Sequence, residues 1–409
     1  MMVDLIASLT RGAIYVSGEG LRCRVALLAS SLSTPVEKRT IAFVSGHIHC
    51  QCSVEDTKVL LPIKPLIEPP EAAGRRNSST GTELNTFTVI STIPKILVGN
   101  LTLRPGEEFN VLYSEVIPKS TCPSFRGLAV RYSWKLAFHC QVLGQATTVI
   151  HIPLWIMILP EVEKVLLSNG DGIRRASNGD SAVDGKLPEE LTFREHNADG
   201  EDEVFVHNGP VNLESALQSL DELTKKRNPK IFNIDCQFGK LGKLTLSKTK
   251  FRLGEEIYGK FDFTDKNVTC IQYLVSLIGD EHICEDHRKP KGVAFSENIV
   301  SRANDFCLCL QQSNFSLPIP LHITHSFSSE IIELKWKLRF EFVLSTEAFH
   351  LDVPQVANEQ QSVLWRAPVR IPVETIAWNL PLDIYPTDPV QVHSVHLRDS
   401  LGGEVKVQL

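Results

Sequence analysis

Large apolar residues alternate with polar residues along two distant segments of the chain, and the two segments share one pattern. From Val130 to Phe138 the large apolar side chains occupy even positions, and the same is true from Ile332 to Phe340. Charged residues occur only at odd positions of both segments. Successive side chains of a β-strand point to opposite faces, so this period predicts strands with one buried face and one solvated face. Such strands are typical of antiparallel sheets.

The resemblance between the two segments indicates an internal duplication. Ser124–Phe138 and Ser326–Phe340 each begin with Ser-Phe, contain Trp-Lys-Leu and lie 202 positions apart. Gly18-Glu19 and Gly254-Glu255 each precede a further run of alternating residues. The aromatic residues of the repeat could stack on a ligand, but their parity assigns them to the two cores. These core residues are Trp134, Trp336, Phe138 and Phe340.

Many short strands in two matched halves predict an all-β protein. We expect two tandem arrestin-like, immunoglobulin-type β-sandwiches, joined by a long acidic linker that is followed by one short helix. The predicted domains are an N-terminal sandwich at 1–167, the linker and helix at 168–230, a C-terminal sandwich at 231–390 and a flexible tail at 391–409. Within the linker, Ser168–Pro210 holds ten acidic and four basic residues, a composition typical of a flexible segment.

A helix is predicted directly after the linker. Leu213, Ala216, Leu217 and Leu220 follow helical spacing, and Pro229 ends the pattern. The apolar face of this helix can pack on the protein's own sheets or on a partner, and the spacing does not separate these alternatives. Leu213, Leu217 and Leu220 are therefore candidate partner-binding residues.

The composition narrows the functional class. The 409 residues carry a net charge of −6, which argues against a nucleic-acid-binding protein. No secretory signal begins the chain and no apolar run is long enough to span a membrane. We therefore expect a cytoplasmic protein whose ten cysteines are reduced and whose membrane contact is only peripheral.

His47–Cys52 is the most plausible metal site, since histidine and cysteine bind zinc. In a regular strand His47 and His49 share one face, whereas Cys50 and Cys52 share the other, so the four cannot converge on one ion. The chain also contains no phosphate-binding glycine loop and no nucleophile elbow. We expect no metal, no cofactor and no catalytic residues, and therefore no enzyme.

Five segments resemble the Rgp family in their order and spacing. These segments are Ile93–Leu97, Pro123–Gly127, Phe315–Leu321, Leu334–Leu338 and Trp378–Leu382. The resemblance extends from about Ile14 to Pro386. It lapses in Pro62–Asn85, in Pro160–Lys230 and after Pro386.

The resemblance implies a function that the residues alone do not. Members of the Rgp family are the smaller, non-catalytic subunit of a two-subunit guanine nucleotide exchange factor. The larger subunit is a Ric-type WD-repeat protein, and the complex activates a Golgi Rab GTPase in endosome-to-Golgi retrograde transport. The resemblance therefore implies a peripheral location on Golgi and trans-Golgi membranes. The alternative is a stand-alone arrestin-like adaptor that binds cargo or receptor tails by adding a strand to a sheet edge.

Overall fold

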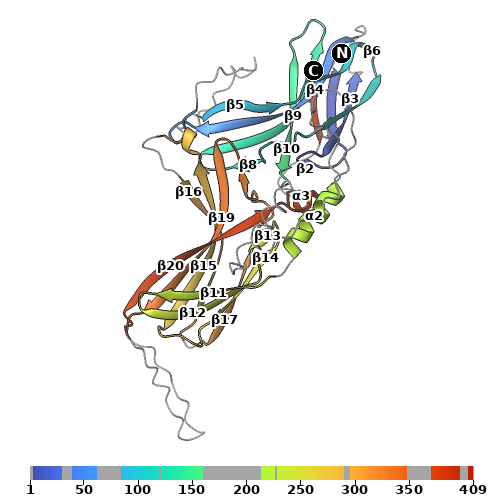
Figure 1. Ribbon diagram of the computed structural model, residues 1–409. Coiled ribbons are helices and arrows are strands. Elements are labelled where there is room, and N and C mark those ends of the chain that lie inside the picture. The colour runs from blue at the N-terminus through green and yellow to red at the C-terminus, as the bar shows by residue number, and fades with distance from the viewer. Residues whose placement is uncertain are drawn as a thin grey trace, which may run out of the picture.

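The computed structural model describes residues 3–29, 39–61, 84–119, 121–159, 213–225, 228–289, 295–308, 310–347, 370–396 and 404–408. Strands dominate these residues, so the predicted all-β class is confirmed. Two groups of sheets stack end to end into an elongated molecule, and both chain termini lie at the N-terminal group (Figure 1). The predicted acidic linker, Ser168–Pro210, lies outside the described residues.

Two sheets form the N-terminal unit. The first is four-stranded, with the order β21 (Glu404–Gln408), β1 (Val3–Leu9), β3 (Gly20–Ala29) and β7 (Glu108–Val116). The second is seven-stranded and runs through β2 (Ile14–Val16), β10 (Thr148–Met157), β9 (Val130–Val142), β4 (Arg39–Glu55) and β5 (Leu84–Ser91). In addition, β6 (Lys95–Leu103) pairs with β4, and β8 (Phe125–Arg126) pairs with β9.

The C-terminal unit repeats this arrangement. Its four-stranded sheet has the order β11 (Lys230–Cys236), β12 (Gly239–Leu246), β14 (Glu256–Asp262) and β17 (Gln312–Pro318). Its six-stranded sheet runs through β13 (Lys250–Arg252), β20 (Val373–Tyr385), β19 (Ile332–Ser345), β15 (Cys270–Ile283) and β16 (Phe295–Phe306). The sixth strand, β18 (Phe327–Ser328), pairs with β19 as β8 does with β9.

The duplication seen in the sequence extends to individual hydrogen bonds. Trp134 Nε1 donates to the Cys122 carbonyl at 3.0 Å, and Trp336 Nε1 donates to the Thr324 carbonyl at 3.2 Å. Trp134, Trp336, Phe138 and Phe340 all lie in the core, as their parity predicts.

The two Gly-Glu turns are equivalent as well. Gly18 and Gly254 have φ values of 81° and 84°, in the left-handed region that favours glycine. The carboxylate of Glu19 accepts the Val16 N–H, and that of Glu255 accepts the Arg252 N–H. Each turn therefore uses glutamate to close the entry to a strand, which explains why the Gly-Glu pair recurs.

The structure differs from the prediction at the C-terminus. Instead of a flexible tail, it places α3 (Pro389–His396) across the predicted boundary at residue 390, and then β21. The described helices are therefore α2 (Leu213–Lys225), α3 and the short 3-10 helix η2 (Glu285–His287), where one helix was expected. Neither α2 nor α3 is long and apolar enough to span a membrane.

Strand β21 takes the place in the N-terminal unit that β11 takes in the C-terminal unit. It pairs antiparallel with β1, and Lys406 Nζ lies 3.0 Å from the Asp4 carboxylate. By the symmetry of the repeat, the C-terminal segment supplies beside β1 the strand that β11 supplies beside β12.

Deletion of residues 398–409 is therefore expected to destabilise the N-terminal unit by about 1–3 kcal/mol, because it removes a strand and leaves β1 as an unpaired edge. Hydrogen exchange should show faster exchange in β1 and unchanged rates in β12. Unchanged exchange in β1 would show that β21 adds nothing to this sheet.

Candidate functional site

The duplicated Ser-Phe strands meet where the N-terminal and C-terminal units join. Each unit consists of two sheets and is called a sandwich from here on. The rings of Phe125 and Phe327 lie 5.1 Å apart and edge to face, and the Tyr132 hydroxyl is 2.9 Å from the Ser329 hydroxyl. Each Ser-Phe strand therefore packs against its counterpart in the other half. Two equivalent segments far apart in the sequence thus form the centre of the junction.

A buried carboxylate from the C-terminal sandwich binds the N-terminal backbone at this junction. Glu281 accepts hydrogen bonds from the N–H groups of Leu128, Ala129 and Val130 at 2.8, 3.1 and 3.2 Å. A Cβ on Gly127 would lie 2.5 Å from both carboxylate oxygens, so glycine is required for this close approach. Hydrogen bonds to a charged acceptor are stronger than neutral ones, and this contact fixes one sandwich relative to the other.

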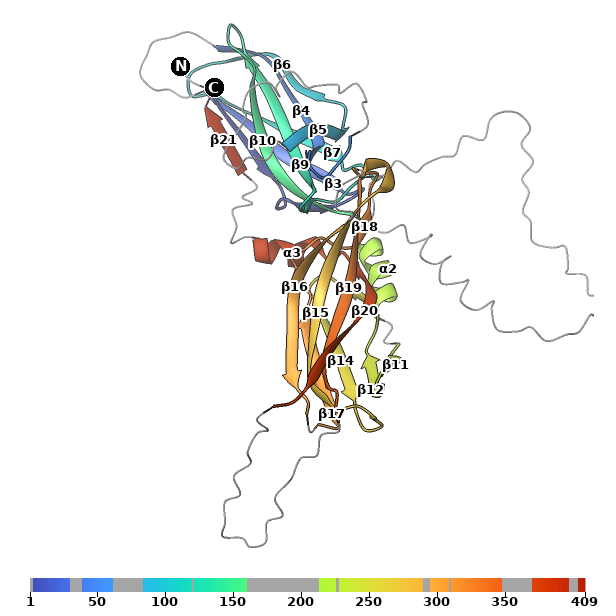
Figure 2. The same ribbon diagram turned by 90° about the vertical axis from the view of Figure 1, so that its left-hand side faces the viewer.

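The β15–β16 connection adds a second contact between the sandwiches. The Leu60 N–H donates to the His287 carbonyl at 2.7 Å, and His287 Nδ1 lies 3.0 Å from the Leu60 carbonyl. Lys289 Nζ donates to the Asp56 carbonyl. The connection, including η2, reaches the N-terminal sandwich in both views (Figures 1 and 2). The two sandwiches therefore present their surfaces in a defined relative orientation.

His325 is buried at the junction. The Ile158 N–H donates to its Nε2 at 3.0 Å, so the ring proton is on Nδ1, which donates to the Ser326 carbonyl at 2.9 Å. Burial lowers the pKa of His325 to about 4, and its hydrogen bond to Ser326 opposes this shift. A second buried histidine, His49, also has its pKa lowered to about 4, mainly by burial.

These histidines predict an acid-labile fold. The unfolded chain binds protons at His325 and His49 below about pH 6.5, whereas the folded chain does not until about pH 4. The free energy of unfolding should therefore be highest above pH 6.5 and fall by up to about 3 kcal/mol for each of the two histidines towards pH 4. Urea unfolding at pH 7 and pH 5 measures this change, and His325→Gln should reduce it. Equal stability of the wild-type protein at both pH values would contradict the prediction.

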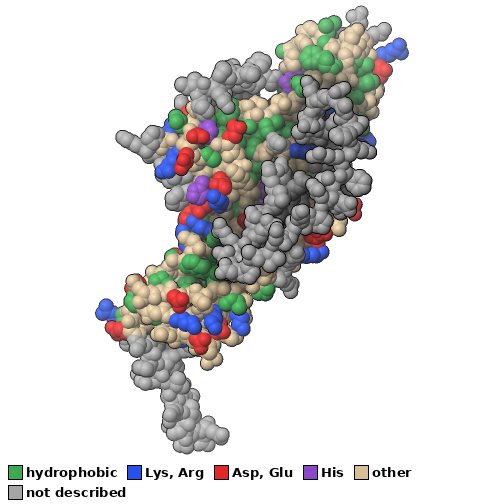
Figure 3. All heavy atoms as spheres, in the orientation of Figure 1, with side chains coloured by type: hydrophobic (Ala, Val, Ile, Leu, Met, Phe, Trp, Pro, Cys, Tyr) green, Lys and Arg blue, Asp and Glu red, His purple; other side chains and the backbone are tan. Residues whose placement is uncertain are grey.

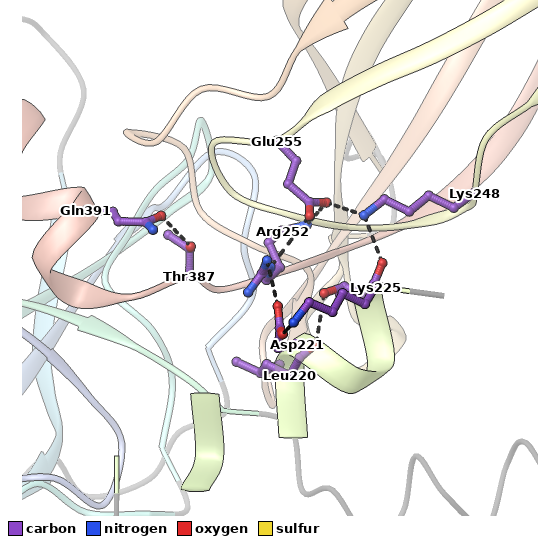
Figure 4. A network of polar contacts seen from close by, with 9 residues as sticks. Leu220, Asp221, Lys225, Lys248, Arg252, Glu255, Thr387 and Gln391 are labelled. Carbon is purple, nitrogen blue, oxygen red and sulfur yellow. Dashed lines mark hydrogen bonds and ion pairs between the residues drawn. The ribbon is translucent and has the colours of Figure 1, made fainter. Parts of the chain in front are cut away.

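Helix α2 is attached to the C-terminal sandwich by polar contacts at its last turns (Figure 4). Lys248 Nζ donates to the Thr224 carbonyl at 2.9 Å and to the Glu255 carboxylate at 2.6 Å. The Asp221 carboxylate lies 3.1 Å from the Arg252 guanidinium. The helix is therefore anchored on the Gly-Glu turn of the C-terminal sandwich.

The three leucines that were candidates for partner binding differ in their exposure to solvent. Leu220 is only 1% exposed, so the rest of this chain already covers it. Leu213 and Leu217 are half-buried, and Leu213 packs against the core. The available part of this helix face is therefore smaller than its leucine spacing indicates, and its role in partner binding stays a prediction.

The histidines and cysteines of His47–Cys52 lie on opposite faces of β4, as the strand argument predicts. Cys50 and Cys52 are in the core, where Cys50 Sγ lies 3.7 Å from Cys122 Sγ. Burial raises the pKa of Cys52 to about 12, so this thiol stays protonated and is a poor nucleophile. The nine cysteines in the described part of the chain are all free thiols.

Two further histidines lie on the same outer face as His47 and His49, which the sequence analysis did not predict. His139 is 5.2 Å from His47, and His151 is 5.8 Å from His49, measured between ring centroids. All four have odd numbers, but the register that brings β4, β9 and β10 together is not visible in the sequence. Within the described ranges, no group of three histidine, cysteine, aspartate or glutamate residues is arranged to hold a metal ion.

Two large apolar side chains are exposed at the turn into β6, Ile93 before the strand and Ile96 in its second position. Ile93 is 84% exposed and Ile96 is 76% exposed, on either side of Pro94 and Lys95. Lys95 is held by the Ser114 carbonyl at 2.8 Å and by the Glu115 carboxylate at 3.0 Å, which positions this turn beside β7. Such adjacent exposed isoleucines are candidates for an interface with another protein.

Charge is mixed on one face of the molecule (Figure 3). Acidic and basic side chains are interspersed among the described residues on the face that Figure 3 draws. This distribution differs from the continuous basic stripe that tracks a nucleic acid backbone. The candidates for an interface with another protein are therefore the partly available helix face and the exposed apolar turn.

Comparison with known proteins identifies a family whose model matches this chain. The Rgp1 family model matches residues 62–165 and 173–345. The chain is 30% identical over 404 residues to RAB6A-GEF complex partner protein 2 of Homo sapiens, a match that covers 95% of this chain and 96% of that protein. It is also 30% identical over 390 residues to the Bos taurus protein of the same name, with 93% of each covered. The family match includes Pro62–Asn85 and much of Pro160–Lys230, where the sequence resemblance was expected to lapse.

Proposed function

This chain belongs to the Rgp1 family, and on that basis we propose that it is a subunit of a guanine nucleotide exchange factor complex for a Rab6-type GTPase. The observation that carries the proposal is the similarity, over nearly the whole of both chains, to relatives named as partner proteins of a RAB6A exchange complex. The second subunit is proposed to be a Ric-type WD-repeat protein, and the complex is proposed to be the active species. The location that fits this role is cytoplasmic and peripheral on Golgi membranes, in endosome-to-Golgi retrograde transport.

Nucleotide exchange fits a chain that offers binding surfaces. Exchange forms and breaks no covalent bond, and it requires a surface that binds the nucleotide-free GTPase better than the loaded one. By linkage, binding of that surface lowers the affinity of the GTPase for its nucleotide by the same factor. This chain is therefore proposed to act as a regulatory subunit without covalent catalysis, and its rigid junction would hold the partner and the GTPase in a fixed arrangement.

The alternative function is a stand-alone cargo or receptor-tail adaptor, for which the all-β architecture would serve equally well. Co-expression with the Ric-type subunit separates the two. An exchange-factor subunit should co-elute with that subunit from size exclusion as a complex of one copy each. An adaptor should elute alone, stable and soluble, whether or not the Ric-type subunit is present.

A stable interface buries about 1,600 Å², with apolar side chains at its centre. We propose that Ile93 and Ile96 belong to this interface, because they are more exposed than any side chain of the α2 leucine face.

Ile93→Asp combined with Ile96→Asp is expected to weaken the affinity for the Ric-type subunit at least about tenfold, since loss of one hot spot costs more than about 1.4 kcal/mol. Leu143→Asp is the matched control, because Leu143 is also an exposed apolar residue at a turn. Leu217→Asp tests the helix separately, without disturbing buried Leu220. Unchanged affinity in the isoleucine variant would remove this turn from the interface.

A further inference from the structure

A groove of about 530 Å³ lies between the two sandwiches, beside the Glu281 contact. Its lining is mainly apolar and comes from both halves, with Trp155 and Leu128 on one side and Trp336, Ile323 and Ile299 on the other. Leu128 is 58% exposed and Ile299 is 41% exposed, so the rim of the groove is open to solvent. Cavities of this size with apolar walls and few polar groups are typical binding sites.

Two arginines beside this groove have no anionic partner in the part of the chain that the structure describes. Arg126 lines the groove, and it lies directly opposite Arg131 in the β8–β9 pair. Residues opposite each other in an antiparallel pair have Cβ atoms about 5 Å apart, and like charges there are destabilising. Both side chains are exposed, and neither makes an ion pair or a side-chain hydrogen bond with another described residue. An anion placed between them would relieve this repulsion.

Glu281 does not neutralise the pair. Its two carboxylate oxygens already accept the three backbone N–H groups of Leu128, Ala129 and Val130. The Ser296 hydroxyl also lies 3.4 Å from the Glu281 carboxylate. No carboxylate of the described residues therefore neutralises the two arginines, and their positive charge is available to a ligand.

The groove is also lined by β16, an edge strand among the described strands. In the described part of the C-terminal sandwich, β16 is the last strand of its sheet and has one neighbour, β15. A register shift leaves Val300 as a bulge, so the regular edge beside the groove is Ser296–Ile299. Free N–H and C=O groups of such an edge can pair with an added extended chain.

We propose that this groove binds an extended, acidic segment of another protein. The segment would pair with the β16 edge, insert an apolar side chain between Trp155 and Ile299, and place a carboxylate between Arg126 and Arg131. The segment should be acidic because the two arginines are positively charged. It should be extended because the free edge of β16 pairs only with an extended chain. This site is additional to the proposed exchange function and does not depend on it.

A peptide selection tests the proposal. A phage library of random twelve-residue peptides is selected on the immobilised full-length chain, and the enriched peptides are synthesised with a fluorescent label. The enriched peptides should carry aspartate or glutamate together with apolar residues at alternate positions. Their affinity for Arg126→Glu and for Ile299→Arg, measured by anisotropy, should be at least about tenfold lower than for the wild type. Binding should also weaken as salt is added.

Arg24→Glu and Leu112→Arg are the matched controls, since both replace exposed residues away from the groove. All four variants change exposed side chains, and thermal melts verify that each is folded. Enrichment of basic peptides, enrichment of no peptide, or equal affinity for Arg126→Glu would overturn the proposal. Co-elution of Arg126→Glu with the Ric-type subunit is measured in parallel, so failure at the groove is distinguishable from failure of the proposed complex.

Discussion

Replacing Trp134 or Trp336 by alanine is expected to lower the free energy of unfolding of its own sandwich by about 3–5 kcal/mol. Each indole is buried in a core and occupies the same position of the duplicated strand, with exposed fractions of 1% and 4%. Truncation would leave a large cavity. It would also leave the Cys122 or Thr324 carbonyl without the indole N–H that now binds it.

Hydrogen exchange resolved by strand is the measurement, because it reports each sandwich separately. Trp134→Ala should accelerate exchange in β4 and β9, and Trp336→Ala should accelerate it in β15 and β19. Leu143→Ala, at an exposed turn, should change stability by less than about 0.5 kcal/mol. A tryptophan variant that melts within one degree of the wild type would refute the assignment of that face to the core.

Glu281→Ala is expected to have an effect of similar size, at the junction. It leaves the N–H groups of Leu128, Ala129 and Val130 without their acceptor, at a cost of about 1–3 kcal/mol for each one that stays buried. We expect a total loss of about 3–5 kcal/mol, together with faster exchange of these three amides. Small-angle scattering should then show a broader range of distances between the sandwiches.

Glu281→Gln keeps one acceptor oxygen and should cause a smaller loss than Glu281→Ala. Glu222→Ala is the control, because Glu222 is an exposed carboxylate on α2. If Glu281→Ala leaves both the three exchange rates and the scattering profile unchanged, the carboxylate does not hold the two sandwiches together.

The strands and their duplication were predictable because each depends on a short-range pattern. Alternation alone identifies the faces of β9 and β19, and helical spacing alone identifies α2. The last strand was missed although Val405 and Val407 alternate with polar residues in it. Five residues are too few to distinguish a strand from a tail, and only their pairing with β1 gives them a place in a sheet.

The junction between the two sandwiches could not be predicted either, and the reason is different. Glu281 lies 152 positions from Ala129, and no local pattern relates a carboxylate to the backbone groups of another domain. The histidines of β4, β9 and β10 could not be predicted as a group for the same reason. His139 and His151 lie near His47 and His49 only because of the register of these three strands. One clue was available in the sequence, because Gly127 belongs to the Pro123–Gly127 segment of the family resemblance. Any larger residue at this position would collide with the Glu281 carboxylate.

Nucleotide release from a Rab6-type GTPase tests the central proposal most directly. The GTPase is loaded with a fluorescent guanine nucleotide, and release is followed with this chain alone, with the Ric-type subunit alone and with both together. The proposal predicts little acceleration by this chain alone and the full rate only with both subunits. Full activity from this chain alone, or no gain when it is added to the Ric-type subunit, would contradict its role as a subunit of the exchange factor.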